Sequence, residues 1–137
     1  MKQTVINKSR LVGINARGSD FSFSNLKEVG LKGATLKYGD LNSCTLKEVD
    51  LTSANLIGAD LKDAQCSGIN LEDANLEGSD MTYANMEGGN LKNAFLLEAN
   101  LHGTNFTNAN LADAYLVDAN IAKAITTGAN LENTILD

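Results

Sequence analysis

The chain has 137 residues, of which 43% are hydrophobic, so we expect one domain with a core of ordinary size. It contains no Pro and no Trp, only 5% aromatic residues, two Cys and one His, which excludes a Pro-rich linker, a disulfide framework and a Cys/His zinc site. Eleven Lys and Arg against seventeen Asp and Glu give a net charge of -6, which argues against nucleic acid as a partner bound through a basic surface.

Residues 1–18 are predicted to form an N-terminal cap. They fit the five-residue pattern of the later chain less well, and Val5, Arg10, Ile14 and Ala16 depart from it. The first residues lack the apolar run of a signal peptide, and no later segment approaches the about 20 apolar residues of a membrane span. We therefore expect a cytoplasmic protein with no membrane partner.

Residues 19–137 repeat with a period of five. Every fifth position from Leu11 to Leu136, here called the central position, is Leu in 18 of 26 cases. Two places earlier, at the small position, 21 of 24 residues between Ser19 and Thr134 are Ala, Gly, Ser, Thr or Cys. Immediately before the central residue, at the Asx position, 16 of 24 residues are Asp or Asn. Such a register predicts central and small side chains in the interior and the other three outside.

A period of five fits neither a straight helix nor a straight strand, so the backbone must turn once in each unit. Two residues after the central position, at the corner position, 14 of 23 residues are Gly, Asn or Asp, which tolerate the positive φ of a turn's third residue. Four such turns close a square of 20 residues. This closure rests partly on the reach of the chain and partly on the resemblance given next.

The unit Ala-(Asp/Asn)-Leu-x-x, as in residues 54–58 and 109–113, is similar to the repeat of the pentapeptide repeat proteins, and the similarity covers about 90% of the chain. The resemblance implies an all-β fold, a right-handed quadrilateral parallel β-helix. Stacked coils would lie about 4.8 Å apart. The expected solenoid has about six coils, and its interior is filled by the central and small positions.

Candidate catalytic and metal-binding residues are few. Cys44 and Cys66 both fall at interior positions, and their register places the Cα atoms near 8 Å, beyond the roughly 7 Å limit for a disulfide. His102 stands alone on the outside, and every Asp and Glu falls at an outward position. We therefore expect no catalytic residue, no metal site and no cofactor, and the protein is not predicted to be an enzyme.

One outward column is acidic. Residues separated by 20 should stack, which places like charges about 4.8 Å apart in a ladder. Two interpretations remain open: the ladder serves a partner, or Asp and Asn are present because their side chains bond nearby backbone N–H groups. The ladder consists of Asp20, Asp40, Asp60 and Asp80 and continues as Asn100 and Asn120.

Charge is also unequal along the chain. Residues 1–49 carry eight basic and four acidic side chains, a net of +4, whereas residues 50–137 carry three basic and thirteen acidic, a net of -10. Some members of the family that the chain resembles imitate duplex DNA and bind type II topoisomerases such as gyrase. An acidic rod is compatible with that role.

A second outward column turns apolar near the C-terminus. There the Asx position changes to Phe95, Tyr115 and Ile135, and an exposed apolar group of this size usually marks an interface. We expect a homodimer about a two-fold axis through this patch and the C-terminal coils, where Ile121, Leu131 and Leu136 would lie open. The patch comprises Phe95, Leu97, Tyr115, Val117, Ile125 and Ile135.

The function predicted from the sequence is a non-catalytic rod that binds an unidentified protein partner. The alternatives are a DNA-mimicking regulator of a type II topoisomerase that confers inhibitor tolerance, and a module that localises or tethers a larger assembly.

Overall fold

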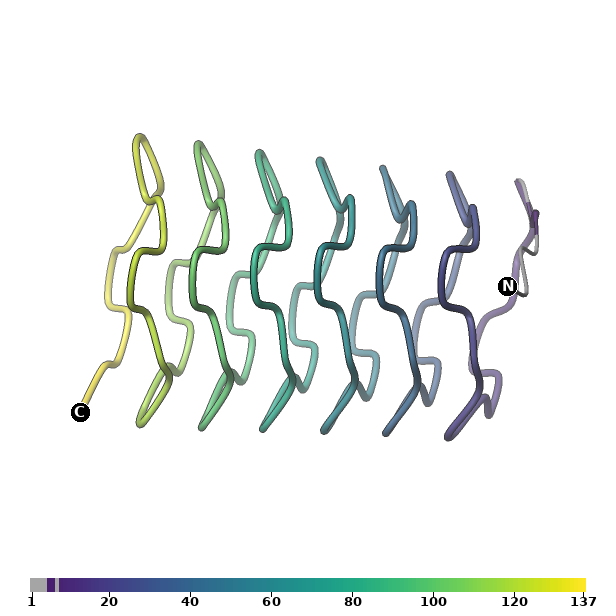
Figure 1. Cartoon of the computed structure of the whole chain (residues 1–137). Coiled ribbons are helices and arrows are strands. Elements are labelled where there is room, and N and C mark those ends of the chain that lie inside the picture. Colours follow the sequence, from purple (N-terminus) through teal and green to yellow (C-terminus); the bar gives the residue numbers. More distant parts are fainter. Residues whose placement is uncertain (1–4, 7) are drawn as a thin grey trace.

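The computed structural model describes residues 5–6 and 8–137 (Figure 1). These residues form a rod of stacked coils with the two chain ends at opposite ends of the rod. They contain neither helices nor extended strands; the coils are joined by isolated parallel β-bridges, which run from Val5↔Asn25 to Tyr115↔Ile135. Each bridge joins Asx positions 20 residues apart, so four bridges lie on each coil. The predicted four-sided parallel β-helix with 20-residue coils is therefore present.

In the middle of the rod, four N–H groups of each unit donate to backbone oxygens, as residues 55–59 illustrate. The central Leu56 N–H donates to Asn75 O of the next coil (2.7 Å), and the corner Gly58 N–H donates to Glu77 O (2.9 Å). The Asn55 N–H donates to Ala34 O of the previous coil (2.9 Å), and the Ala59 N–H closes the turn on Leu56 O (3.0 Å). Because three of these bonds join coils, Pro at these positions would break the ladder.

The turn at each corner is of type II. The bond from the fourth residue to the first is present, and only the third residue has a positive φ. All 26 described corner residues from Lys8 to Asn133 have a positive φ, and 17 of them are residues other than Gly. Phe23, Tyr38 and Tyr83 are among them, with φ between 57° and 59°. The predicted corner is confirmed, and the register imposes it even on large side chains.

The interior contains the predicted columns. Central and small residues from Leu26 to Leu116 are buried. Side-chain sizes compensate between coils: the small central Cys66 accompanies the large Ile69, and on the next coil Met86 accompanies Gly89. A Cβ on Gly89 would lie 3.3 Å from Ile69 Cγ2 and 3.0 Å from Met86 O. The larger side chain of the pair thus changes from the small position on one coil to the central position on the next.

The two ends of the rod differ from its middle. Pairing begins at Val5, so it extends through the described part of the predicted N-terminal cap; residues 1–4 and 7 lie outside the described residues, and the cap itself stays a prediction. At the other end, central residues are about half exposed, and a hollow of about 280 Å³ opens among side chains of the last coils. These exposed central residues include Ile121, Leu131 and Leu136. No helix of the described residues is long and apolar enough to cross a membrane.

Candidate interaction surfaces

The Asp and Asn column has a structural cause. Four of the five N–H groups of a unit donate to backbone oxygens, and the fifth, on the residue after the central one, has its acceptor in the Asx side chain. The Ile57 N–H, for example, donates to Asn55 Oδ1 (3.2 Å). All 16 Asp and Asn residues of this column between Asp20 and Asn130 accept this bond. The side-chain–backbone interpretation of the ladder is therefore supported for Asp and Asn alike.

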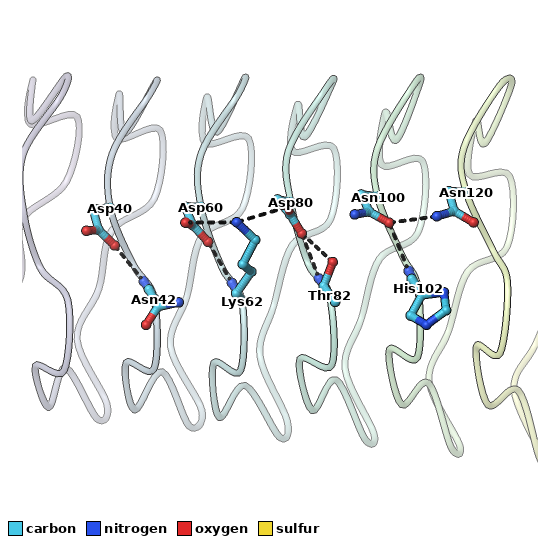
Figure 2. Close-up of polar contacts among 9 residues, drawn as sticks. All are labelled: Asp40, Asn42, Asp60, Lys62, Asp80, Thr82, Asn100, His102 and Asn120. Atoms are coloured by element: carbon cyan, nitrogen blue, oxygen red, sulfur yellow. Dashed lines mark hydrogen bonds and ion pairs between the residues drawn. The ribbon is translucent and has the colours of Figure 1, made fainter.

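The acidic ladder contains a cation (Figure 2). Lys62 Nζ lies 3.5 Å from Asp60 Oδ2 and 3.2 Å from Asp80 Oδ2, so it bridges two successive coils. Further along, Asn120 Nδ2 donates to Asn100 Oδ1 (2.9 Å). The ladder is thus less negative than the column of Asp residues alone predicts.

The bridge affects the ionisation of its members. Partial burial acts to raise the pKa of Asp80, but the hydrogen bonds from the Thr82 hydroxyl and N–H and the Lys62 ammonium outweigh it and hold this pKa below its usual value. The hydrogen bond to Asp80 is the main cause that raises the pKa of Lys62, and the charge of Asp60 adds to it. Asp80 and Lys62 therefore stay charged at neutral pH.

The residues of the predicted apolar patch do not all share one side of the rod. The rings of Phe95 and Tyr115 stack with their centroids 5.0 Å apart and their planes at 9°, and Ile135 follows in the same column. Phe95 remains 41% exposed and Tyr115 38%. Leu97 and Val117 are half-buried beside the stack. Ile125 is 48% exposed but pairs with Asn105, half a coil from the 95/115/135 column, so it lies on the opposite side of the rod and is not part of the stack.

Four residues of the predicted patch stand at Asx positions without being Asp or Asn. Phe95, Tyr115, Ile125 and Ile135 occupy Asx positions, where Asp or Asn would accept the fifth N–H of the unit. Their side chains offer no acceptor there. The chain therefore lacks a local hydrogen bond at each of these positions and exposes apolar surface instead.

The remaining candidates are accounted for by the interior and by local contacts. Cys44 and Cys66 are buried free thiols, and Cys44 Sγ donates to Phe21 O (2.6 Å). Burial raises the pKa of Cys44 to about 11 and also raises that of Cys66, so neither is a ready nucleophile. The His102 ring packs edge-on against Tyr83 at 5.5 Å. Within residues 5–6 and 8–137, no three His, Cys, Asp or Glu side chains are grouped to hold a metal ion.

One cluster was missed by the sequence reasoning. Tyr38 projects from a corner, with Arg17 Cζ and Lys37 Nζ each 5.1 Å from its ring centroid. Its ring lies over Gly58 of the next coil, where a Cβ would lie 2.6 Å from Tyr38 Cδ1. The available signal was an aromatic residue followed 20 residues later by Gly, which recurs at Tyr83 and Gly103.

Stacked, bridge-paired coils of 20 residues define the class of protein as a four-sided β-helical solenoid. A family model for the pentapeptide repeat region matches residues 49–126, and a model for pentapeptide repeats in eight copies matches residues 30–64. The chain belongs to the pentapeptide repeat family.

Solved structures agree with this assignment. The chain is similar to a pentapeptide repeat protein from the Arabidopsis thaliana thylakoid lumen, at 30% identity over 74% of this chain and 70% of that chain, with a TM-score of 0.71. A pentapeptide repeat protein from Nostoc PCC 7120 matches at 26% identity over 81% and 83%, with a TM-score of 0.54. A plasmid-mediated fluoroquinolone resistance protein matches at 16% identity over 99% and 83%, with a TM-score of 0.36, which carries no argument about function. Comparison with curated protein sequences gave no significant match.

Proposed function

We propose that this pentapeptide repeat protein is a non-catalytic scaffold that binds a protein through the side of the rod bearing Phe95, Tyr115 and Ile135. The observation that carries the proposal is the exchange at these Asx positions. At these positions Asp or Asn would accept a hydrogen bond from a backbone N–H, as the 16 Asp and Asn residues at other Asx positions do. The fold does not require stacked exposed rings, so their presence is explained by a contact outside the coil.

The test replaces the patch by the residue that its column favours. Phe95→Asn, Tyr115→Asn and Ile135→Asn together should leave stability unchanged or higher, because each Asn can accept the unpaired N–H. The same variant should lose the partners that wild type binds from cell extract, identified by mass spectrometry and confirmed with purified protein. Tyr83→Asn is the matched control, since Tyr83 is 57% exposed and lies at a corner away from the patch. Identical partners for wild type and the triple variant would contradict the proposal.

A DNA-mimicking regulator of a type II topoisomerase is the second candidate, favoured by the thirteen acidic against three basic residues after residue 49. The Asx hydrogen bond is made equally by Asn, so it does not explain why Asp40, Asp60 and Asp80 are acidic. Gyrase supercoiling with and without a fluoroquinolone, at several salt concentrations, tests this function. A variant with Asp40→Asn, Asp60→Asn and Asp80→Asn together that protects gyrase as well as wild type would show that the ladder takes no part in this function.

A further inference from the structure

One corner of the rod changes charge from end to end. Its corner residues are separated by 20, and we call this column, together with the residue preceding each member, the 18–118 edge. The first two members follow the cations Arg17 and Lys37, the middle two are Gly58 and Gly78, and the last two are acidic. In order, the corner residues are Gly18, Tyr38, Gly58, Gly78, Glu98 and Asp118.

The cations of this edge face an aromatic ring and not a carboxylate. Arg17 and Lys37 both lie over Tyr38, and within residues 5–6 and 8–137 neither is within ion-pair distance of an acid. By contrast, Lys27 pairs with Glu28 at 3.1 Å and Lys47 with Glu48 at 3.9 Å. The basic end of the 18–118 edge therefore has free capacity for an anion.

The acidic end is complementary. Glu98 and Asp118 are exposed, and no Lys, Arg or His among the described residues lies within ion-pair distance of either. Each follows an apolar residue of the patch, Leu97 or Val117. An approaching Lys or Arg could lay its aliphatic stem on these apolar residues and place its charge against the carboxylate.

In the middle of the edge, a projecting ring lies one coil from an uncovered glycine. The ring of Tyr38 lies over Gly58 and stands out from the rod, 53% exposed. At Gly78, one coil further, no atom would lie within 4 Å of an added Cβ, so the edge is open there. The edge thus carries a projecting ring and an uncovered corner glycine one coil apart.

We propose that the partner on this side of the rod is a second copy of the chain, which lies antiparallel about a two-fold axis between Gly58 and Gly78. This rests on the function proposed above and names its partner. The axis places Tyr38, whose ring covers Gly58, against Gly78 of the second copy. It also places Lys37 opposite Glu98 of that copy, and Arg17 opposite Asp118. All contacts occur twice, as an isologous interface requires.

This arrangement replaces the two-fold axis expected at the C-terminal coils. An axis there would bring Glu98 and Asp118 of both copies together, and like charges in contact oppose association. The axis between Gly58 and Gly78 places opposite charges together at both ends. One side of so thin a rod is a small interface, so we expect a concentration-dependent dimer with a Kd of about 1–100 μM.

Charge reversal tests the pairing by sedimentation equilibrium. Arg17→Glu with Lys37→Glu leaves only acidic charges on the edge, and Glu98→Lys with Asp118→Lys leaves Glu77 as its one acidic residue. Each variant alone should raise the dimer Kd at least about 10-fold, whereas an equimolar mixture should form a heterodimer because every contact then joins opposite charges. The control is Lys27→Glu with Lys47→Glu, which makes the same change in net charge on another side and should leave the Kd unchanged.

Cysteine cross-linking tests the position of the axis. Ile57→Cys and Glu77→Cys, mixed as two chains, should form a disulfide between copies under mild oxidation, and Val117→Cys alone should not. Cross-linking of Val117→Cys alone would overturn the proposal in favour of the C-terminal axis. A wild type that stays monomeric at about 100 μM would also overturn it. If the Asn triple variant still loses partners from cell extract in that case, the scaffold function stands with a foreign partner.

Discussion

At the residue scale, the corner position and the Asx position are constrained by the backbone in different ways. The corner requires positive φ of every residue, which costs about 1–2 kcal/mol for side chains other than Gly. The Asx position supplies the acceptor for the fifth N–H, and this explains why Asp and Asn, which bond local backbone groups readily, dominate it. The first demand is enforced by the coil, and Tyr38 and Glu48 meet it despite their size.

Gly58→Ala should be more destabilising than Gly78→Ala. Both residues have φ of +62°, so both substitutions incur the same cost of about 1–2 kcal/mol in backbone conformation. Only at position 58 does the new Cβ also meet the Tyr38 ring, 2.6 Å from Cδ1, so the ring must leave its place. Urea denaturation of both variants measures the difference. In a Tyr38→Ala background the difference should vanish; equal costs in the wild-type background would show that the ring does not lie on Gly58.

Ala74→Leu should destabilise the protein by at least about 1–3 kcal/mol, because the small position is fully buried and has no room for added methylenes. Ala74→Ser should be mild. Thr104, at a small position, shows how a hydroxyl is accommodated there, since it donates to Met81 O at 2.8 Å. Thermal unfolding compares the two variants. A Leu variant that melts like wild type would mean that position 74 is not in the interior.

At the scale of the repeating element, much of the fold could be predicted because a pentapeptide determines its own register. The period located the interior columns and the corner, whereas the 20-residue stacking also needed the reach of the chain and the resemblance to pentapeptide repeat proteins. The Lys62 bridge to Asp60 and Asp80 and the Tyr38 ring over Gly58 could not be predicted, because a long outward side chain chooses its direction from neighbours on two coils. The apolar residues of the patch were visible in the sequence, but which of them share a side and which charges lie beside them depend on how the columns are arranged around the rod.

Because of the Lys62 bridge, the free energy of unfolding should depend on pH in the acidic range. The pKa of Asp80 is lower in the folded chain than its usual value of about 3.9, so the carboxylate stabilises the fold above pH 4. That stabilisation is lost as pH falls through the lowered pKa. Carboxyl NMR of wild type should show Asp80 titrating below its usual range. In Lys62→Gln the Asp80 midpoint should rise, whereas Lys92→Gln, on another side of the rod, should not move it; an unchanged midpoint in Lys62→Gln would show that the ion pair is not formed.

At the scale of the whole molecule, each coil contacts only its two neighbours, so stability should vary along the rod as it does in other solenoids. The middle coils have a fully buried interior, whereas the last coil shares its central side chains with solvent. Charge varies in the same direction, from +4 over residues 1–49 to -10 over residues 50–137. This polarity makes antiparallel pairing of two rods electrostatically favourable and parallel pairing unfavourable.

Leu71→Ala and Leu131→Ala should differ because the same substitution is made in one column at two heights of the rod. Leu71 is fully buried, so its truncation removes apolar contact and leaves a cavity at a cost of about 2–5 kcal/mol. Leu131 is 47% exposed at the end, where the hollow already admits solvent, so its truncation should cost less than about half as much. Urea denaturation gives both values, and hydrogen exchange should show slower amide exchange in residues 51–91 than in residues 118–137. Equal costs with uniform exchange would mean that the coils unfold as one unit and that the end coil is as well packed as the middle.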